Sequence, residues 1–310
     1  YRNFLKSNEF FKSLPEYRLI DPQQPLKNIQ ACMDEFATSW LSRCKSKAPF
    51  VKNPPVFFIG FPRSGTTLLG RMLNSHSKIH LIEEKVSLEK FIADTLPKEK
   101  QYPRNLAELT ENQIRNLQIL YMEEIKKHVG NEADLVHKLL IDKVPMNTVH
   151  LGLIYRLFPE AKVIFSLRNC ADVVLSCFMQ KFGLNNTMAN FLDLKSTANL
   201  YNKTMELFEL YQNTLQLQII SVRYENLIVD TEYELKVLFD FLELPWEEGV
   251  LNYRQNSFGA EINTPSYAAV SEKLYSSSRE RWKNYEKQLQ PVLPIIQPWL
   301  EKFGYSEESS

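Results

Sequence analysis

One loop near residue 60 carries residue types suited to binding an anion. The string GFPRSGTT, residues 60–67, has two glycines separated by four residues and follows the apolar run Val56–Ile59. At this spacing between a strand and a helix, backbone N–H groups and the positive helix end can cradle a phosphate or sulfate. The planar guanidinium of Arg63 adds a fork of donors for such an anion. We therefore predict an anion-binding loop here.

The loop differs from that of nucleotide hydrolases at one position. In those enzymes a lysine follows the second glycine and reaches the β- and γ-phosphates, and the next Ser or Thr binds magnesium. Thr66 stands in the position of that lysine. The sequence therefore disfavours ordinary ATP or GTP hydrolysis, and a P-loop phosphotransferase stays open only as an alternative.

The full string PRSGTTL, residues 62–68, resembles the 5′-phosphosulfate loop of the sulfotransferase superfamily. The resemblance implies a donor, 3′-phosphoadenosine 5′-phosphosulfate (PAPS), whose product is adenosine 3′,5′-bisphosphate. It implies that the donor is bound by Arg63, Ser64, Gly65, Thr66 and Thr67. It also implies metal-independent transfer of a sulfuryl group to a hydroxyl acceptor, and the sequence has no evident cluster of metal ligands.

A second motif lies in VIFSLRNCADVVLS, residues 163–176. It resembles the arginine that ends a strand in this superfamily, followed by a serine on the next helix. The resemblance implies that Arg168 and Ser176 bind the 3′-phosphate of the donor. An arginine at a strand end and a serine two turns into the following helix can converge on one anion.

A third segment, IDKVP at residues 141–145, resembles the K-x-P segment of the superfamily. The resemblance implies that Lys143 lies near the bridging oxygen of the donor, where negative charge grows as the S–O bond breaks.

The string HSKIHLIEEK, residues 76–85, is similar to a segment of the tyrosylprotein sulfotransferases and of related bacterial proteins that follow tetratricopeptide repeats. That register implies Glu83 as the catalytic base. Glu84 is the alternative base, because Ile82 stands where a glycine is usual. His80 is a lesser alternative, since histidine serves in the cytosolic branch of the superfamily.

Two further segments resemble donor-binding parts of the superfamily. VRYENL, residues 222–227, is similar to a Y-E-x-L turn and implies that Tyr224 approaches the adenosine side of the donor. TPS at 264–266 and SSRERW at 277–282 resemble a carboxy-terminal loop that closes over the 3′-phosphate. That resemblance implies roles for Ser266 and Arg281.

Short apolar runs alternate with amphipathic segments along the chain. Strands are predicted at 56–59, 79–82, 139–141, 163–167 and 218–223, and helices at 66–73, 106–127, 148–157, 172–181, 189–215, 232–242 and 291–303. The alternation predicts an α/β fold: a P-loop-type central parallel sheet of about five strands, flanked by helices, with ligands at the carboxyl ends of the strands. The long interval 84–138 predicts a helical insertion over the active site.

The chain is predicted to contain a helical N-terminal segment or linker, residues 1–53, and a sulfotransferase domain, residues 54–310. The first part holds one amphipathic candidate helix, residues 26–44, and ends in the basic, proline-bearing stretch KSKAPFVKNPP. The chain opens on Tyr1, so an upstream repeat domain or a removed anchor is compatible with it.

Composition narrows the partners of the protein. Lys and Arg number 37 and Asp and Glu number 37, so no global field would draw a nucleic acid or an anionic membrane. No apolar stretch is long enough to span a membrane.

The 4 cysteines lack CxxC spacing and are predicted to be buried thiols: Cys32, Cys44, Cys170 and Cys177. A cytoplasmic location is expected, or the Golgi lumen if an anchor has been removed; the oligomeric state is unknown.

The acceptor has no recognisable code in the sequence. A peptide tyrosine, a glycan or a small molecule would be bound by residues 84–138 and by the loop 183–190. A catalytically silent module that binds adenosine bisphosphate is a further alternative to an enzyme, and Arg63, Lys143 and Glu83 argue against it.

Overall fold

Five strands form a single parallel sheet at the centre of the molecule. The computed structural model describes residues 1–37, 39–96, 102–130, 136–253 and 279–305. The strand order is β2-β3-β1-β4-β5, and every pairing is parallel. The strands are β1 (Val56–Gly60), β2 (Ile79–Glu83), β3 (Leu139–Lys143), β4 (Lys162–Leu167) and β5 (Gln218–Arg223). The predicted α/β fold with a five-stranded parallel sheet is thereby confirmed.

Helices connect the strands and extend the chain at both ends. The α-helices are α1 (Arg2–Ser13), α2 (Gln24–Phe36), α3 (Trp40–Arg43), α4 (Thr66–Asn74), α5 (Leu88–Thr95), α6 (Glu111–Lys126), α8 (Leu151–Leu157), α9 (Cys170–Met179), α10 (Leu194–Thr214), α11 (Tyr224–Val229), α12 (Thr231–Leu242), α14 (Glu286–Leu289) and α15 (Leu293–Lys302). Short 3-10 helices are η1 (Pro15–Leu19), η2 (Arg104–Leu106), η3 (Pro145–His150), η4 (Met188–Leu192), η5 (Glu248–Asn252) and η7 (Arg281–Tyr285).

The predicted helices other than 26–44 are present, and in three of them, at 106–127, 148–157 and 189–215, a 3-10 helix occupies the first residues. The predicted helix 26–44 was wrong as one element: α2 ends at Phe36, and α3 begins at Trp40. Between them Ser39 has φ 32°, a left-handed conformation that an α-helix cannot continue through. Helix α1 was not predicted from the sequence.

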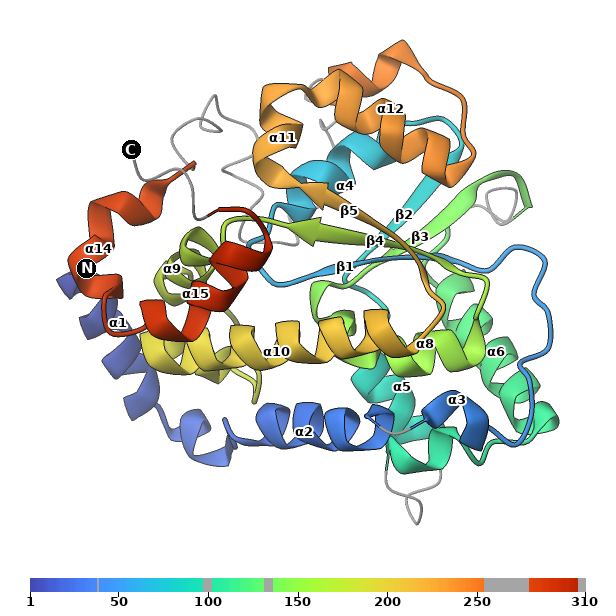
Figure 1. Cartoon of the computed structure of the whole chain (residues 1–310), viewed down its shortest axis with the longest axis horizontal. Helices are drawn as coiled ribbons and strands as arrows, with labels where there is room; N and C mark the ends of the chain where they lie inside the picture. The colour runs from blue at the N-terminus through green and yellow to red at the C-terminus, as the bar shows by residue number, and fades with distance from the viewer. Residues whose placement is uncertain (38, 97–101, 131–135, 254–278, 306–310) are drawn as a thin grey trace.

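The helices cover both faces of the sheet. Helices α4, α11 and α12 lie on one face, while α8, α9 and α10 lie on the other, with α2 beyond α10 (Figure 1). Side chains of β1 alternate between the two cores: Phe57 and Ile59 pack with the α10 side, and Val56 and Phe58 with the α4 side. A strand buried on both faces reads as a continuous apolar run, which is why β1 was predictable.

The first 53 residues share a core with the rest of the chain. Ile29, Cys32, Phe36 and Trp40 are fully buried, and α2 packs along α10. The ring of Phe36 contacts Trp40 and Tyr211, with ring centroids 4.5 and 5.0 Å away. The N-terminal helices are therefore a part of the same packed body.

The interval 84–138, predicted to be a helical insertion over the active site, contains the helices α5, η2 and α6. The longest of them, α6, packs on a face of the sheet and not over the site. Helix α6 lies against the face of the sheet beside α8 (Figure 1). Its Tyr121 packs against Phe57 of β1 and Phe158, with centroids 5.8 and 5.6 Å away. Within the described residues, α6 thus serves as the crossover helix between β2 and β3, and α5 follows directly from the carboxyl end of β2.

Three of the cysteines are buried and Cys44 is partly exposed, all as free thiols. Among the described residues, no helix has the length and apolar character needed to cross a membrane.

Candidate active site

The carboxyl ends of all five strands carry residues that the sequence singled out. Glu83 ends β2, Lys143 ends β3, and the loop 60–67 follows β1. Arg168 directly follows β4, and Tyr224 directly follows β5. Because β1 is the middle strand, the anion-binding loop has Lys143 on one side and Arg168 on the other. Parallel sheets bind ligands at this edge.

The loop 60–67 has the backbone that its glycines predicted. Gly65 caps α4 with φ 94°, in the left-handed region that favours glycine. A Cβ on Gly65 would lie 2.6 Å from Cδ2 of Tyr224, and one on Gly60 would lie 2.9 Å from the carbonyl oxygen of Ser166. Both glycines therefore allow a close approach of neighbouring strands to the loop.

Arg63 also has a left-handed backbone, with φ 71°. For a residue with a Cβ this conformation costs about 1–2 kcal/mol. Strain held at a loop of this kind is typical of functional positions.

Three side chains anchor the loop, and two of them, Thr148 and Ser166, were not predicted from the sequence. The Thr148 hydroxyl accepts from the Gly60 N–H at 3.1 Å and lies 2.8 Å from the Gly60 carbonyl. The Ser166 hydroxyl donates to the Ser64 carbonyl at 2.7 Å. The Tyr224 ring packs against Gly65. The loop is thus fixed by side chains of three elements: Thr148 of η3, Ser166 of β4 and Tyr224 of α11.

Glu83, Glu84 and Lys143 form one ion-pair cluster. The β2–β3 register pairs Glu83 with Lys143, and the Lys143 Nζ lies 2.5 Å from Glu83 Oε1 and 3.2 Å from Glu84 Oε1. The Lys143 side chain is fully buried, while those of Glu83 and Glu84 are 34% and 42% exposed. A solvent-accessible carboxylate beside a fixed ammonium at a strand end is an arrangement suited to general-base chemistry.

The two glutamates differ in their backbone. Glu83 is the last residue of β2, whereas Glu84 has φ 53° and donates its N–H to the Lys143 carbonyl at 2.9 Å. His80 lies three residues before Glu83 on the same strand, so alternation directs its side chain to the opposite face.

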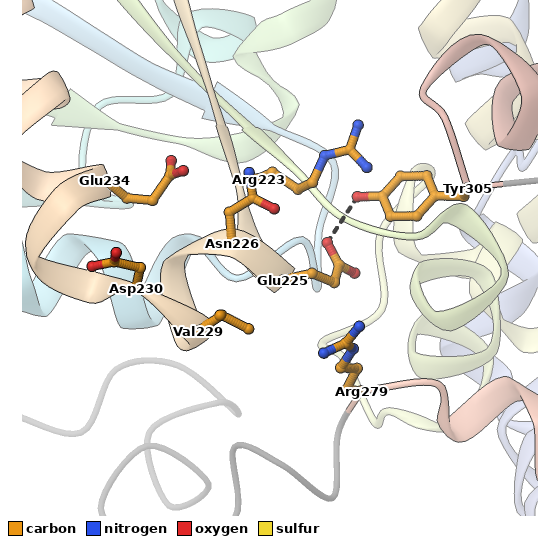
Figure 2. Close-up of a pocket in the computed structure, with 8 residues that line it drawn as sticks. All are labelled: Arg223, Glu225, Asn226, Val229, Asp230, Glu234, Arg279 and Tyr305. Carbon is orange, nitrogen blue, oxygen red and sulfur yellow. Dashed lines mark hydrogen bonds between the residues drawn. The ribbon is translucent and has the colours of Figure 1, made fainter. Parts of the chain in front are cut away.

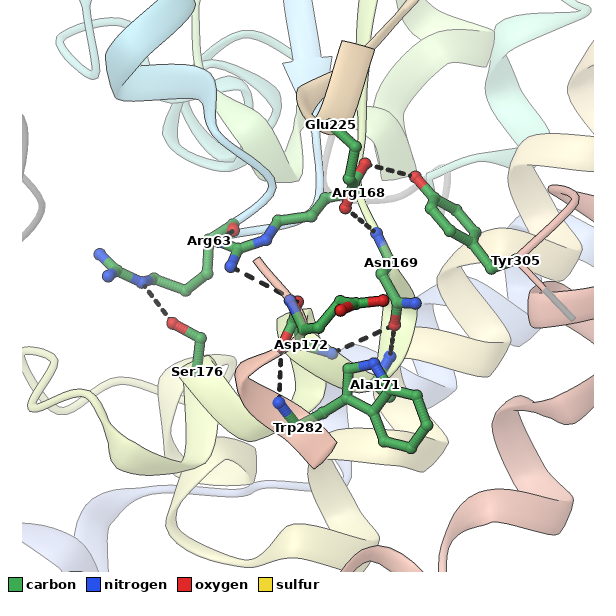
Figure 3. A network of polar contacts seen from close by, with 10 residues as sticks. Arg63, Arg168, Asn169, Ala171, Asp172, Ser176, Glu225, Trp282 and Tyr305 are labelled. Atoms are coloured by element: carbon green, nitrogen blue, oxygen red, sulfur yellow. Dashed lines mark hydrogen bonds and ion pairs between the residues drawn. The ribbon is translucent and has the colours of Figure 1, made fainter. Parts of the chain in front are cut away.

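The arginines of the two phosphate motifs lie together (Figure 3). Arg63 Nε donates to the Ser176 hydroxyl at 3.0 Å, and Arg168 Nη1 donates to the Arg63 carbonyl at 3.2 Å. The Arg168 guanidinium also lies over the Tyr224 ring, 4.6 Å from its centroid. Arg63, Arg168, Ser176 and Tyr224 thus converge from four elements on one corner of the sheet.

Arg281 joins this cationic corner from the carboxy-terminal segment. Burial lowers the pKa of Arg63, and the nearby positive charges of Arg168 and Arg281 lower it further. The Asp172 carboxylate accepts hydrogen bonds from the backbone N–H groups flanking Arg281, those of Glu280 and Trp282. Of the two predicted residues of the carboxy-terminal loop, Ser266 lies outside the described residues.

A pocket of about 230 Å³ lies beside this corner, at the start of α11 (Figure 2). It is lined by Arg223, Glu225, Asn226, Val229, Asp230, Glu234, Arg279 and Tyr305. Its Glu225 carboxylate accepts from the Tyr305 hydroxyl at 2.8 Å and from the Asn169 N–H at 3.0 Å. Glu225 therefore links Asn169, the residue after Arg168, to Tyr305 near the carboxy terminus.

No group of three or more His, Cys, Asp or Glu side chains within the described ranges could hold a metal ion. His76, one of the two histidines with a four-residue spacing, is buried and lies 2.8 Å from the Pro245 carbonyl through Nε2. Its Nδ1 accepts from the Lys78 N–H at 3.1 Å.

The fold and the corner define an α/β protein with a cationic, loop-based anion site at the carboxyl edge of its sheet. A family model described as "Sulfotransferase family" matches residues 54–248, which is more than half of the chain. The chain belongs to the sulfotransferase family.

Known relatives agree with this assignment. An uncharacterized protein of Aquifex aeolicus (strain VF5) is 32% identical over 307 residues, covering 96% of this chain and 39% of that protein. Protein-tyrosine sulfotransferase 1 of Danio rerio is 26% identical, covering 84% of this chain and 76% of the relative. Protein-tyrosine sulfotransferase 1 of Homo sapiens is 28% identical, covering 93% of this chain and 80% of the relative. This chain therefore spans less than half the length of the Aquifex relative.

Proposed function

We propose that the chain transfers a sulfuryl group from PAPS to a hydroxyl acceptor. The observation that carries the proposal is the flanking of the loop 60–67 by two different sets of charges. On one side lies Lys143 with Glu83 and Glu84, and on the other the corner of Arg63, Arg168 and Arg281. The first set supports proton and charge transfer, and the second supports binding of a doubly phosphorylated nucleotide.

The donor set fits such a nucleotide. Arg63, Ser64, Gly65, Thr66 and Thr67 would hold the 5′-phosphosulfate, and Arg168, Ser176 and Arg281 the 3′-phosphate. Arg168 contacts the Arg63 carbonyl and Arg281 lies close by, so positive charge is concentrated at this corner, which favours binding of an anion. Tyr224, stacked under Arg168, would border the adenosine. When bound, PAPS supplies the activated sulfuryl group.

The residues of the chain would divide the remaining work. Lys143 and Arg63 would stabilise the charge that develops on the leaving phosphate, together with the loop N–H groups. Glu83 would accept the proton of the acceptor hydroxyl. Its placement opposite Lys143 in the strand register supports it over Glu84. Protonation of Glu83 would neutralise its carboxylate and so weaken its ion pair with Lys143.

The acceptor is proposed to be a tyrosine hydroxyl in a peptide. The relatives named protein-tyrosine sulfotransferase support this choice over a glycan or a small phenol. A pocket lined in part by Glu89, Tyr102 and the loop residues Asn185 and Asn186 lies where the two predicted acceptor-binding segments meet. Its polar lining supports binding of a polar acceptor there.

A transfer assay with radiolabelled donor, run across peptide, glycan and phenol pools, tests the proposal. We expect label on tyrosine peptides, and no stimulation of ATP γ-phosphate release by magnesium. Glu83→Ala should lower transfer by about 10²–10⁴-fold, the usual contribution of a general base. Adenosine bisphosphate affinity, measured by calorimetry, should stay that of the parent.

Glu84→Ala is the matched control, because it removes the second carboxylate at the same lysine. A loss of transfer confined to Glu84→Ala would identify Glu84 as the base. If both variants kept the activity of the parent, a glutamate base would be rejected. Nucleotide binding by the parent with no transfer to any pool would favour the silent module. Magnesium-dependent ATP hydrolysis would favour the phosphotransferase.

A further inference from the structure

We propose that Asp172 is a positioning residue for donor binding: it fixes the backbone of residues 280–282 and thereby sets Arg281 beside Arg63 and Arg168. The proposal rests on the proposed function, since Arg281 is assigned to the 3′-phosphate there. Asp172 itself would not touch the donor.

The contacts of Asp172 reach across the sequence. Its Oδ2 accepts from the Glu280 N–H at 2.9 Å, and its Oδ1 accepts from the Trp282 N–H at 2.8 Å (Figure 3). These donors lie 108 and 110 residues further along the chain. The two oxygens of one buried carboxylate thus hold the backbone N–H groups of the residues before and after Arg281.

The held segment needs such a clamp. Glu280 has φ 55°, a left-handed conformation that is strained for a residue with a Cβ. It is followed by η7, which begins at Arg281. Hydrogen bonds from backbone N–H groups to a charged acceptor are stronger than those to a neutral acceptor. Two of them are enough to offset the backbone strain and keep Arg281 in place.

Asp172 also balances the charge of the corner. Its Oδ2 lies 3.8 Å from Arg168 Nη2, and its side chain is almost completely buried. Burial raises the pKa of Asp172, while Arg168 and the two N–H donors oppose that shift. Asp172 lies in the first turn of α9, where any carboxylate is favoured by the helix dipole. Local helix capping, however, does not require the contacts to Glu280 and Trp282, because Asn169 already caps α9.

A comparison of two nucleotides tests the proposal. Adenosine 3′,5′-bisphosphate and adenosine 5′-monophosphate are titrated calorimetrically into the full chain and its variants. Asp172→Asn offers one acceptor oxygen to two N–H donors, so we expect bisphosphate affinity to fall about 10-fold, the usual effect of losing one charge-assisted contact. Monophosphate affinity should not change. Arg281→Ala should likewise lower the affinity for the bisphosphate and not that for the monophosphate. The double variant Asp172→Asn/Arg281→Ala should bind the bisphosphate no more weakly than Arg281→Ala alone.

Asp193→Asn is the matched control, because Asp193 accepts a backbone N–H at the start of α10, away from the corner. Asp172→Ser, which is smaller and cannot overpack the site, repeats the test if Asp172→Asn does not fold. Unchanged bisphosphate affinity, equal loss of both nucleotides, or additivity with Arg281→Ala would overturn the proposal. Failure of the parent to bind the bisphosphate would contradict the donor site itself, and this proposal with it.

Discussion

Two neighbouring residues at the end of β3 face opposite sides of the sheet and meet different electrostatic conditions. Lys143 points to the α4 side, where the absence of a side chain on Gly70 leaves room for its stem and two carboxylates meet its ammonium. Asp142 points to the α6 side, where it is fully buried and accepts from the Tyr121 hydroxyl at 2.5 Å. Alternation along one strand thus separates an ion-paired lysine from a buried carboxylate that is hydrogen-bonded to a tyrosine hydroxyl.

Asp142 should make stability depend on pH. Burial raises its pKa from 3.8 to about 7. Between these values the folded state keeps a proton that the unfolded state loses, so stability falls as pH rises from about 4 to about 7. Asp142→Asn removes this term and keeps the acceptor for Tyr121. We expect the variant to gain about 4 kcal/mol over the parent at pH 8 and almost nothing at pH 4, at about 1.4 kcal/mol per pKa unit.

Urea unfolding of both proteins at a series of pH values measures this difference. Asp193→Asn serves as the control, because Asp193 caps α10 at an exposed helix start. A difference between Asp142→Asn and the parent that stays constant across pH would show that Asp142 is ionised in the folded state.

At the scale of elements, the packing of α2 on α8 depends on one glycine. A Cβ on Gly152 would lie 2.1 Å from Cζ of Phe36, and that ring is fully buried against Trp40 and Tyr211. Gly152→Ala should therefore destabilise the chain by about 1–3 kcal/mol, the range for overpacking a core. Gly249→Ala is the control, since a Cβ there meets nothing within 4 Å. Equal urea midpoints for the two variants would mean that α2 adjusts freely.

The elements themselves were largely predictable, because each strand is a short apolar run between turn residues. β5 was predicted with its observed bounds, 218–223. The positions of the candidate site residues at the strand ends were predictable too, since their motifs are local in sequence. Asp172, Glu225 and Thr148 were missed because their partners lie far along the chain: Thr148 contacts Gly60 88 residues away. Only tertiary packing brings such pairs together, and no local pattern encodes it.

At the scale of the whole molecule, the first 53 residues bear on whether residues 54–310 can fold alone. The family model begins at residue 54, yet the Aquifex relative aligns with 96% of the chain, which includes most of residues 1–53. The structure gives a reason for this extent, because Ile29, Cys32, Phe36 and Trp40 fill the core beside α10.

Removal of residues 1–53 should therefore unfold the remainder. Burying the three large apolar side chains Ile29, Phe36 and Trp40 contributes about 1.5–3 kcal/mol each, or about 5–9 kcal/mol in total, and a domain is stable by about 5–15 kcal/mol. We expect residues 54–310 alone to bind a hydrophobic dye and to lack a cooperative thermal transition. Adding back a peptide of residues 1–53 should restore that transition, because the exposed face of α10 is complementary to α2. A truncated chain that unfolds cooperatively near the melting temperature of the parent would establish 54–310 as an independent domain and residues 1–53 as an accessory to it.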